Sequence, residues 1–208
     1  MKRLTLIILG VLLCTPLYSD MNPYIAGVPV SGGSCDSACD PESNEVGVRT
    51  FSETCNANLA VGASLATLYT PDCSGYLDMA YVFQGNIAPF SGPVKIFVYL
   101  DDGDSVPDSG DELIAKTASI TGGTASTWYN SAITESCVSV STENSYWIVI
   151  ACDDDSAYGF RYSYPSAIGG TAYTDTTGDY YDAEPSTLGD GEWGSPTSRR
   201  TSVYVTID

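Results

Sequence analysis

Hydrophobic and polar residues follow one another in short runs along this chain, and apolar residues at helical spacing are rare after residue 20. Runs of four to eight β-branched and aromatic residues, bounded by Gly, Pro, Asn, Asp and Ser, are typical of β-strands. The pattern therefore predicts an all-β fold, a single jelly-roll-like β-sandwich stabilised by disulfides. Its nine expected strands are Ser64–Tyr69, Gly75–Phe83, Val94–Leu100, Glu112–Ile120, Ser126–Tyr129, Cys137–Ser141, Tyr146–Cys152, Tyr158–Tyr164 and Ser202–Ile207.

The first residues have the pattern of a secretory signal peptide. Lys2 and Arg3 precede the apolar stretch Leu4–Leu13, and we place cleavage after Ser19. A membrane-spanning helix needs about 20 apolar residues, roughly twice the length of this stretch. We therefore expect a secreted or cell-surface protein with no membrane span.

The remaining chain divides at residue 59. Residues 20–58 begin with a stretch rich in Gly, Ser, Pro and Asp, and we expect an extended N-terminal arm there. Residues 59–208 form the predicted sandwich. Within it, residues 169–196 are predicted to be a long loop with a short hairpin, and long loops in compact domains are often functional.

Six cysteines remain after the signal peptide, an even number that suits an oxidising compartment. Residues 136–152 are predicted to form a hairpin about Asn144-Ser145, and this register places Cys137 opposite Cys152. We therefore predict a Cys137–Cys152 disulfide. Proximity predicts two more, Cys35–Cys39 and Cys55–Cys73, although Cys35 or Cys39 could equally reach Cys55.

The charge balance limits the partners. The chain carries 8 basic and 26 acidic residues, and its net charge of −18 becomes −20 once Lys2 and Arg3 are removed. A field of this sign repels phosphates, so we expect no nucleic-acid partner. Divalent cations are the natural counter-ions.

The densest acidic stretch runs from Asp101 to Glu112, directly after an apolar strand pattern. Calcium takes six to eight oxygen ligands from carboxylates and carbonyls on a sharply turning loop, and Gly103, Pro107 and Gly110 supply turns here. We predict a structural calcium site that fixes a hairpin between Leu100 and Leu113; a solvated acidic loop is the alternative. The predicted metal ligands are Asp101, Asp102, Asp104, Asp108, Asp111 and Glu112.

This stretch resembles the calcium loop of the SdrD B-like domains of bacterial adhesins. The matching residues are Tyr99-Leu100-Asp101, Gly103-Asp104, Val106, Asp108 and Gly110-Asp111, with one residue fewer before Gly103 than in the family. Residues 60–208 also resemble jelly-roll-like extracellular modules of the choice-of-anchor type. That resemblance rests on Asn144–Ile150, Phe160–Tyr164 and Gly169–Tyr173, and it implies a non-catalytic sandwich on an exported protein.

Three further features are candidate sites. Asp153-Asp154-Asp155 could complete a metal site if its loop lies at the same end of the sandwich as Asp101, but a solvated turn is the simpler expectation. Trp193 lies in a polar Gly-rich loop, where it is either an exposed contact or a lid on the core. One face of a predicted strand carries Tyr158, Phe160, Tyr162 and Tyr164, which would form either a sugar-binding platform or half of the core.

Catalysis finds little support in the sequence. The chain has no histidine, which excludes the common serine and cysteine triads and His-ligated zinc. We expect a non-enzymatic structural or adhesive surface protein, such as a filament or surface-layer subunit that binds itself. The alternatives are a carbohydrate-binding module that binds extracellular glycans and a two-carboxylate glycoside hydrolase.

Overall fold

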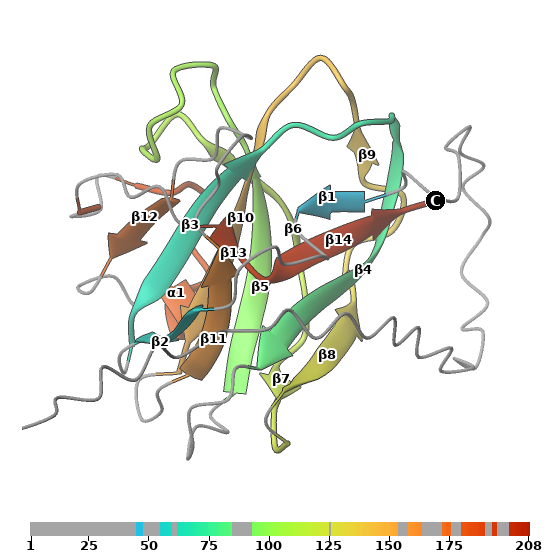
Figure 1. Ribbon diagram of the computed structural model, residues 1–208. Coiled ribbons are helices and arrows are strands. Elements are labelled where there is room, and N and C mark those ends of the chain that lie inside the picture. Colours follow the sequence, from blue (N-terminus) through green and yellow to red (C-terminus); the bar gives the residue numbers. More distant parts are fainter. Residues whose placement is uncertain are drawn as a thin grey trace, which may run out of the picture. The chain divides into compact units, whose positions relative to one another are not determined.

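The computed structural model describes residues 45–47, 55–59, 62–84, 93–124, 126–153, 158–163, 172–175, 180–189, 193–194 and 200–208, without the side chains of 55–59, 158–163 and 200–201. All of them belong to the second of two units into which the chain divides, Gly33–Asp208. These residues form two antiparallel sheets and one short helix, so the predicted all-β sandwich is confirmed (Figure 1).

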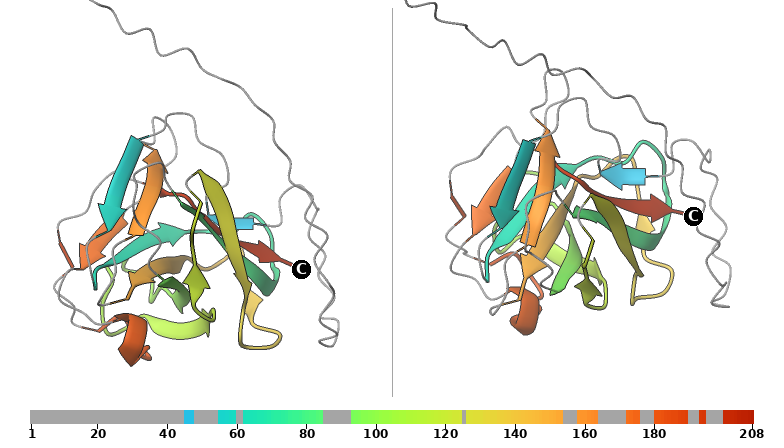
Figure 2. Two further views of the ribbon diagram at one scale, coloured as in Figure 1. Left: turned by 90° about the horizontal axis from the view of Figure 1, so that it is seen from below. Right: turned by 60° about the horizontal axis from the view of Figure 1, so that its bottom comes forward.

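The larger sheet, sheet A, has eight strands and is built around β4 (Gly75–Gln84). On one side β4 pairs with β14, and on the other with β8 and β9. Figure 2 shows β11 beside β2, farther along the same sheet. The other strands are β1 (Glu45–Gly47), β2 (Cys55–Leu59), β8 (Thr127–Ala132), β9 (Ser139–Val140), β11 (Tyr158–Ser163), β13 (Arg200–Thr201) and β14 (Val203–Ile207).

The smaller sheet, sheet B, has six strands with β10 (Tyr146–Cys152) between β3 and β5. All seven residues of β10 are buried, as expected for a continuous apolar run covered on both faces. The remaining strands are β3 (Ser64–Tyr69), β5 (Pro93–Leu100), β6 (Glu112–Lys116), β7 (Ile120–Thr121) and β12 (Ala172–Asp175).

The main core lies between the sheets. Alternate residues of sheet A strands, such as Val82 and Val205, pack with alternate residues of sheet B strands, such as Ile96 and Ile148. Each of these four side chains is 0% exposed. Such burial contributes about 1.5–3 kcal/mol per large apolar side chain. This core fixes the register of β5 and β10, and so the position of the loop that leaves β5.

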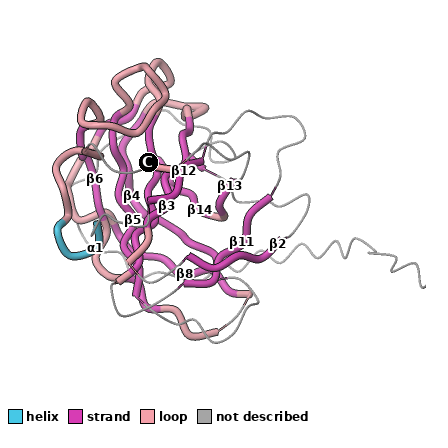
Figure 3. The backbone as a smooth tube through the Cα atoms, turned by 90° about the vertical axis from the view of Figure 1, so that its left-hand side faces the viewer, coloured by secondary structure: helices cyan, strands magenta, loops and turns pink. Residues whose placement is uncertain are grey.

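A second apolar layer covers the other face of sheet B. The covering segment, which we define as residues 180–189, begins with helix α1 (Tyr180–Ala183) and contributes Tyr180, Tyr181 and Leu188. They pack with Phe97, Tyr99, Trp147 and Tyr173 of the sheet. In Figure 3, α1 is the only helix among the described residues and lies close to β6.

One carboxylate holds the covering segment to the sheet. Glu184 accepts hydrogen bonds from Lys95 of β5 and from Lys116 of β6, the latter at 2.6 Å. Lys95 also donates to the carbonyl of Tyr181, at 2.9 Å, and lies over that residue's ring. The Glu184 backbone has a left-handed φ of 45°, which ends the helix there.

The strand predictions differ in accuracy. Ser64–Tyr69 and Tyr146–Cys152 are exact, and the other seven expected strands overlap observed ones. The predicted strand Glu112–Ile120 is divided between β6 and β7. Strand β1 lies within the expected N-terminal arm and β2 runs from its end into Leu59, while β12 and α1 lie within the expected loop 169–196.

The predicted hairpin of residues 136–152 is wrong. Strand β9 pairs with β4 in sheet A, whereas β10 pairs with β3 and β5 in sheet B. The turn between them passes from one layer to the other. Adjacent runs in sequence suggested pairing, but β3 and β5 occupy both edges of β10, which leaves no edge for β9.

The Cys137–Cys152 disulfide is wrong for the same reason. Cys152 is a buried thiol at the end of β10 that takes no part in a disulfide. Cys73 and Cys137 each take part in a disulfide whose partner lies outside the described residues. The Cys55–Cys73 and Cys35–Cys39 pairings stay predictions, because Cys35, Cys39 and the Cys55 side chain lie outside the described residues.

Candidate metal centre

The acidic loop, residues 101–111, connects β5 to β6 at one end of sheet B. The two strands bring its ends together, with Leu100 opposite Glu112. The Asp101 amide donates to the carbonyl of Ser145 at 3.1 Å, which joins the loop to the start of β10. Within the loop, Gly103 and Ser105 have φ values of 103° and 62°. These left-handed residues fold the loop back on itself.

Asp111 lies at the centre of this loop and is 0% exposed. Its Oδ1 accepts a hydrogen bond from the Asp102 amide at 3.2 Å, and its Oδ2 accepts one from the Asp108 amide at 2.9 Å. Its own carbonyl accepts the amide of Leu188 at 3.2 Å. Asp111 therefore organises the loop from inside and joins it to the covering segment.

Asp101 connects the loop to the second apolar layer. Its Oδ1 accepts hydrogen bonds from the Ser105 amide at 3.2 Å and from Trp147 Nε1 at 3.1 Å. Trp147 is 0% exposed and packs edge-on against Tyr173, with ring centroids 5.7 Å apart. A polar atom in a buried indole needs a partner, and this carboxylate provides it.

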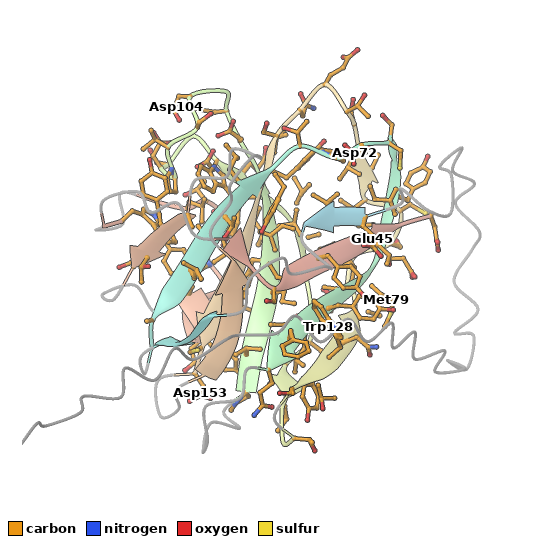
Figure 4. The ribbon with its side chains drawn as sticks, in the orientation of Figure 1. Glu45, Asp72, Met79, Asp104, Trp128 and Asp153 are labelled. Atoms are coloured by element: carbon orange, nitrogen blue, oxygen red, sulfur yellow. The ribbon has the colours of Figure 1, made fainter. Side chains whose placement is uncertain are left out.

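Five of the six predicted ligands come together in two overlapping groups. Asp101, Asp102 and Asp111 form one group, and Asp102, Asp104 and Asp108 form the other. Within each group, one carboxylate oxygen per residue lies within 4.8 Å of the others. Figure 4 shows Asp104 in this loop at one end of the sandwich. This oxygen-only donor set fits a hard cation such as calcium.

The sixth predicted ligand, Glu112, is in neither group. It begins β6, is exposed, and forms an isolated bridge with Thr187 of the covering segment. Since side chains alternate across a strand, Glu112 and its neighbour Asp111 point to opposite faces. The sequence could not show which of the two adjacent acids would face inward.

A side chain at Gly110 would force neighbouring carboxylates of the loop to move. A Cβ atom there would lie 2.3 Å from Asp102 Oδ2 and 3.1 Å from Asp108 Oδ1. The Gly110 amide also donates to that Asp108 oxygen, at 2.6 Å. Gly110 thus lets one carboxylate from each group approach the backbone closely.

Burial and mutual repulsion act on these acids. Desolvation raises the pKa of Asp111 to about 6, against the lowering effect of the hydrogen bonds from the Asp108 and Asp102 amides, and the charges of Asp101 and Asp108 add a smaller rise. Desolvation also raises the pKa of Asp101, although the Trp147 hydrogen bond opposes this. Because both pKa values are raised, the ionised forms of Asp101 and Asp111 are costly without a cation.

Asp153 lies at the other end of the fold. In the β10–β5 register, Tyr146 faces Leu100 beside the acidic loop, and Cys152 faces Val94 at the far end. Figure 4 shows Asp104 and Asp153 correspondingly at opposite ends of the fold. Asp153 therefore cannot complete the metal site, and Asp154 and Asp155 lie outside the described residues.

The predicted aromatic contacts differ in outcome. Trp193 is half-buried and packs against Tyr180, with centroids 5.4 Å apart, while Gly194 donates to the Thr174 carbonyl at 2.9 Å. Of the two alternatives for Trp193, an exposed contact or a lid on the core, the structure shows the lid. The side chains of Tyr158, Phe160 and Tyr162, and all of Tyr164, lie outside the described residues.

A second aromatic group, which the sequence analysis missed, lies on the outer face of sheet A. Tyr81 and Tyr204 stack with centroids 4.5 Å apart, and Trp128 packs edge-on against Tyr204 and Phe83. Trp128 and Tyr81 are half-buried. Figure 4 labels Trp128 of β8 and Met79 of β4, which lie at different heights along the paired strands. The alternation of side chains within each strand could have predicted which residues share a face. It could not have predicted that β4, β8 and β14 would bring their aromatic rings together.

Comparison with known protein families finds none that matches the chain, and comparison with curated proteins finds no match. Among the described residues, no helix is both long and apolar enough to span a membrane.

Proposed function

We propose that this chain is a secreted, non-catalytic structural or adhesive surface protein whose β-sandwich is stabilised by calcium and disulfides. The observation that carries the proposal is the grouping of carboxylates around buried Asp111, tied to the core through Asp101 and Trp147. A self-assembling filament or surface-layer subunit is the form of this function that we favour.

Calcium suits this loop better than other common cations. Its donors are carboxylate oxygens on an irregular loop, and calcium accepts six to eight oxygen ligands in flexible geometry. Magnesium requires a near-ideal octahedron, and zinc prefers nitrogen and sulfur ligands. The candidate ligands are Asp101, Asp102, Asp104, Asp108 and Asp111.

The bound ion would have a structural role. It would neutralise carboxylates that the fold holds within 4.8 Å of one another, and it would fix the connection between β5 and β6. Because the carbonyl of Asp111 accepts the Leu188 amide, the same ion would also support the covering segment. The resemblance to adhesin calcium loops supports this role.

Export is supported by the signal-like N-terminus and by disulfide-bonded Cys73 and Cys137. The absence of histidine from the sequence supports a non-catalytic function. A large negative charge keeps an extracellular domain soluble and repels nucleic acid.

Terbium luminescence tests the site directly, because Tb³⁺ replaces calcium and is excited by a nearby indole. We expect Trp147 to sensitise bound Tb³⁺, and we expect calcium to displace it. Asp111→Asn should remove the signal, whereas Asp72→Asn, which changes an exposed acid outside the loop, should leave it intact. Absence of sensitised emission from the wild-type protein would contradict the calcium proposal.

Glycan binding is the second candidate function, favoured by half-buried Tyr81 and Trp128, which pack on the buried rings of Phe83 and Tyr204. Sugar rings stack on such side chains. Soluble cello- and chito-oligosaccharides should then quench tryptophan fluorescence, and Trp128→Ala should remove the quench while Trp193→Phe preserves it. A lack of any saccharide-dependent quench would contradict this candidate.

A further inference from the structure

Two disulfide-bonded cysteines lie beside the same end of β4. Cys73 comes shortly before Gly75, where β4 begins and pairs with β9. Cys137 comes just before β9, and the carbonyl of its neighbour Val138 accepts the Leu77 amide at 2.9 Å. The partner of each cysteine lies outside the described residues, so both bonds join this end of β4 to the N-terminal part of the chain.

The mature chain offers three candidate partners outside the described side chains: Cys35, Cys39 and Cys55. Cys55 begins β2, where it pairs with Tyr162 of β11, and β11 meets β4 at Gln84. Gln84 is the last residue of β4. Cys55 therefore lies near the opposite end of β4 from Cys73 and Cys137.

The length of β4 excludes Cys55 as a partner. The 10 residues of this strand span about 30 Å at about 3.3 Å per residue, whereas disulfide-bonded Cα atoms lie within about 7 Å of each other. Figure 4 labels Asp72, next to Cys73, at the upper right, and Figure 1, in the same orientation, shows β2 at the lower left. Two partners are needed, so Cys35 and Cys39 remain.

The N-terminal end of β1 points to this same end of β4. Strand β1 pairs antiparallel with β14, with Glu45 opposite Thr206. Its N-terminal end is therefore directed toward Asp208, which exchanges two backbone hydrogen bonds with Tyr76, at 2.9 and 2.8 Å. Tyr76 follows the first residue of β4, so the chain joins the sandwich beside Cys73.

Cys39 and Cys35 lie close enough to Glu45 in the sequence to make these bonds. An extended chain spans up to about 3.5 Å per residue, which gives Cys39 a reach of about 20 Å from Glu45 and Cys35 a reach of about 35 Å. The order β1, β14, β4, β9 places β9 about 15 Å from β1, at about 4.8 Å between neighbouring strands. Both cysteines also belong to the unit Gly33–Asp208, which contains the sandwich.

We propose that Cys35 and Cys39 form disulfides with Cys73 and Cys137, one with each, and so fasten the N-terminal arm to the β4–β9 end of the fold. Cys55 takes part in neither bond. This pairing differs from Cys35–Cys39 and Cys55–Cys73, which proximity in the sequence predicts. The inference rests on the proposed exported, disulfide-stabilised protein, for which it names the bonds.

The two bonds limit how copies of this chain can assemble. An arm fastened at two points stays on its own sandwich, so it cannot be exchanged with a second copy as a swapped element. Association of oxidised copies must then use surfaces of the folded sandwich.

Disulfide mapping of the mature protein, secreted into an oxidising compartment and never reduced, tests the pairing. Combined cleavage before aspartate and after glutamate places every cysteine of residues 20–208 in a different peptide, because an aspartate follows both Cys35 and Cys39. We expect mass spectra to show the Cys73 and Cys137 peptides each linked to a Cys35 or Cys39 peptide. A Cys55–Cys73 link or a Cys35–Cys39 link would overturn the proposal.

One variant and a matched control sharpen the test. Cys137→Ser should leave the Cys73 link intact and free one N-terminal thiol, which iodoacetamide then labels. It should also lower the melting temperature by about 5–15 °C, because the lost bond closes a loop of about 100 residues. Cys55→Ser is the control, since it removes a cysteine that belongs to neither bond, and loss of either link in this variant would contradict the pairing. If Cys137→Ser is not secreted, the wild-type map decides alone.

Melting the oxidised protein with calcium and with chelator separates this inference from the calcium site. A different disulfide map, in a protein that still melts higher in calcium, overturns the pairing and leaves the calcium site standing. The expected map, in a protein whose melting is indifferent to calcium, does the reverse.

Discussion

The indole Nε1 of Trp147 donates a hydrogen bond of 3.1 Å to Asp101 Oδ1, so a fully buried ring is joined to the loop that carries the candidate metal ligands. Trp147 belongs to a strand that is buried along its whole length. The hydrogen bond between Asp101 and Trp147 therefore links the conformation of the acidic loop to the packing of the second apolar layer.

Removing this hydrogen bond should weaken both folding and calcium binding. Trp147→Phe keeps an aromatic ring against Tyr173 but loses the donor to a charged acceptor, a loss of about 1.5–3 kcal/mol in the free energy of unfolding. Urea unfolding and calorimetric calcium titration measure the two effects. Trp128→Phe, on sheet A, should leave calcium affinity unchanged, and an equal loss of affinity in both variants would contradict this role for Trp147.

The stability of the calcium-free protein should fall as the pH rises from about 4 to about 7. Asp111 has a raised pKa of about 6 in the folded state, so the folded protein binds a proton more tightly than the unfolded chain does. The stability that this gives is present at low pH and is lost as Asp111 ionises. Thermal melting in chelator at several pH values measures this, and Asp111→Asn should flatten the profile. A melting temperature that rises between these pH values, in the wild type and in Asp111→Asn alike, would contradict this prediction.

Gly110→Ala should reduce calcium affinity by about tenfold or more, an effect of about 1.4 kcal/mol. The added Cβ would lie 2.3 Å from Asp102 Oδ2, so that carboxylate must move. Gly123→Ala is the control, because a Cβ atom there would lie 3.9 Å from its nearest neighbour, the Tyr129 hydroxyl. Competition with Tb³⁺ measures the affinity, and equal affinities for the two variants would show that the Asp102 position is unimportant.

Glu184→Gln should destabilise the covering segment by about 1 kcal/mol, since partly exposed ion pairs are screened by solvent. Hydrogen bonds from Lys116 and Lys95 lower the pKa of Glu184. This contribution is present at neutral pH and is lost as the pH falls through the folded-state pKa, the opposite sign to Asp111. Urea unfolding at low and high salt measures it. Glu143→Gln, which changes an exposed acid in the turn before β10, should have little effect; a loss as large as that of Glu184→Gln would contradict the assignment.

Cys152 should resist alkylation in the folded protein and react in denaturant without any reductant. Its side chain is 1% exposed and takes no part in a disulfide. Iodoacetamide labelling followed by peptide mass spectrometry measures this. A Cys152 peptide that is labelled only after reduction would show that the thiol assignment is wrong.

The sequence predicted the strands whose patterns were decided locally. The apolar run of β10 and the run of β3 had clear turn residues at both ends, and both strands were located exactly. The pairing of the strands could not be predicted in the same way, because it depends on contacts between segments far apart in the sequence. The β9–β10 hairpin failed for this reason, and the Cys137–Cys152 disulfide failed with it.

The acidic loop was predictable as a cluster because its ligands are close in sequence. Which acid would be buried was not, since only the register of β6 turns Asp111 inward and Glu112 outward. The contact between Asp101 and Trp147 joins residues 46 apart, and no local pattern indicates it.

Thermal melting of residues 20–208 in calcium and in chelator tests the central claim most directly, with Asp111→Asn measured alongside. Saturating calcium should raise the wild-type midpoint by about 5–10 °C and should leave the Asp111→Asn midpoint unchanged. Equal wild-type midpoints in calcium and chelator would contradict a structural calcium site.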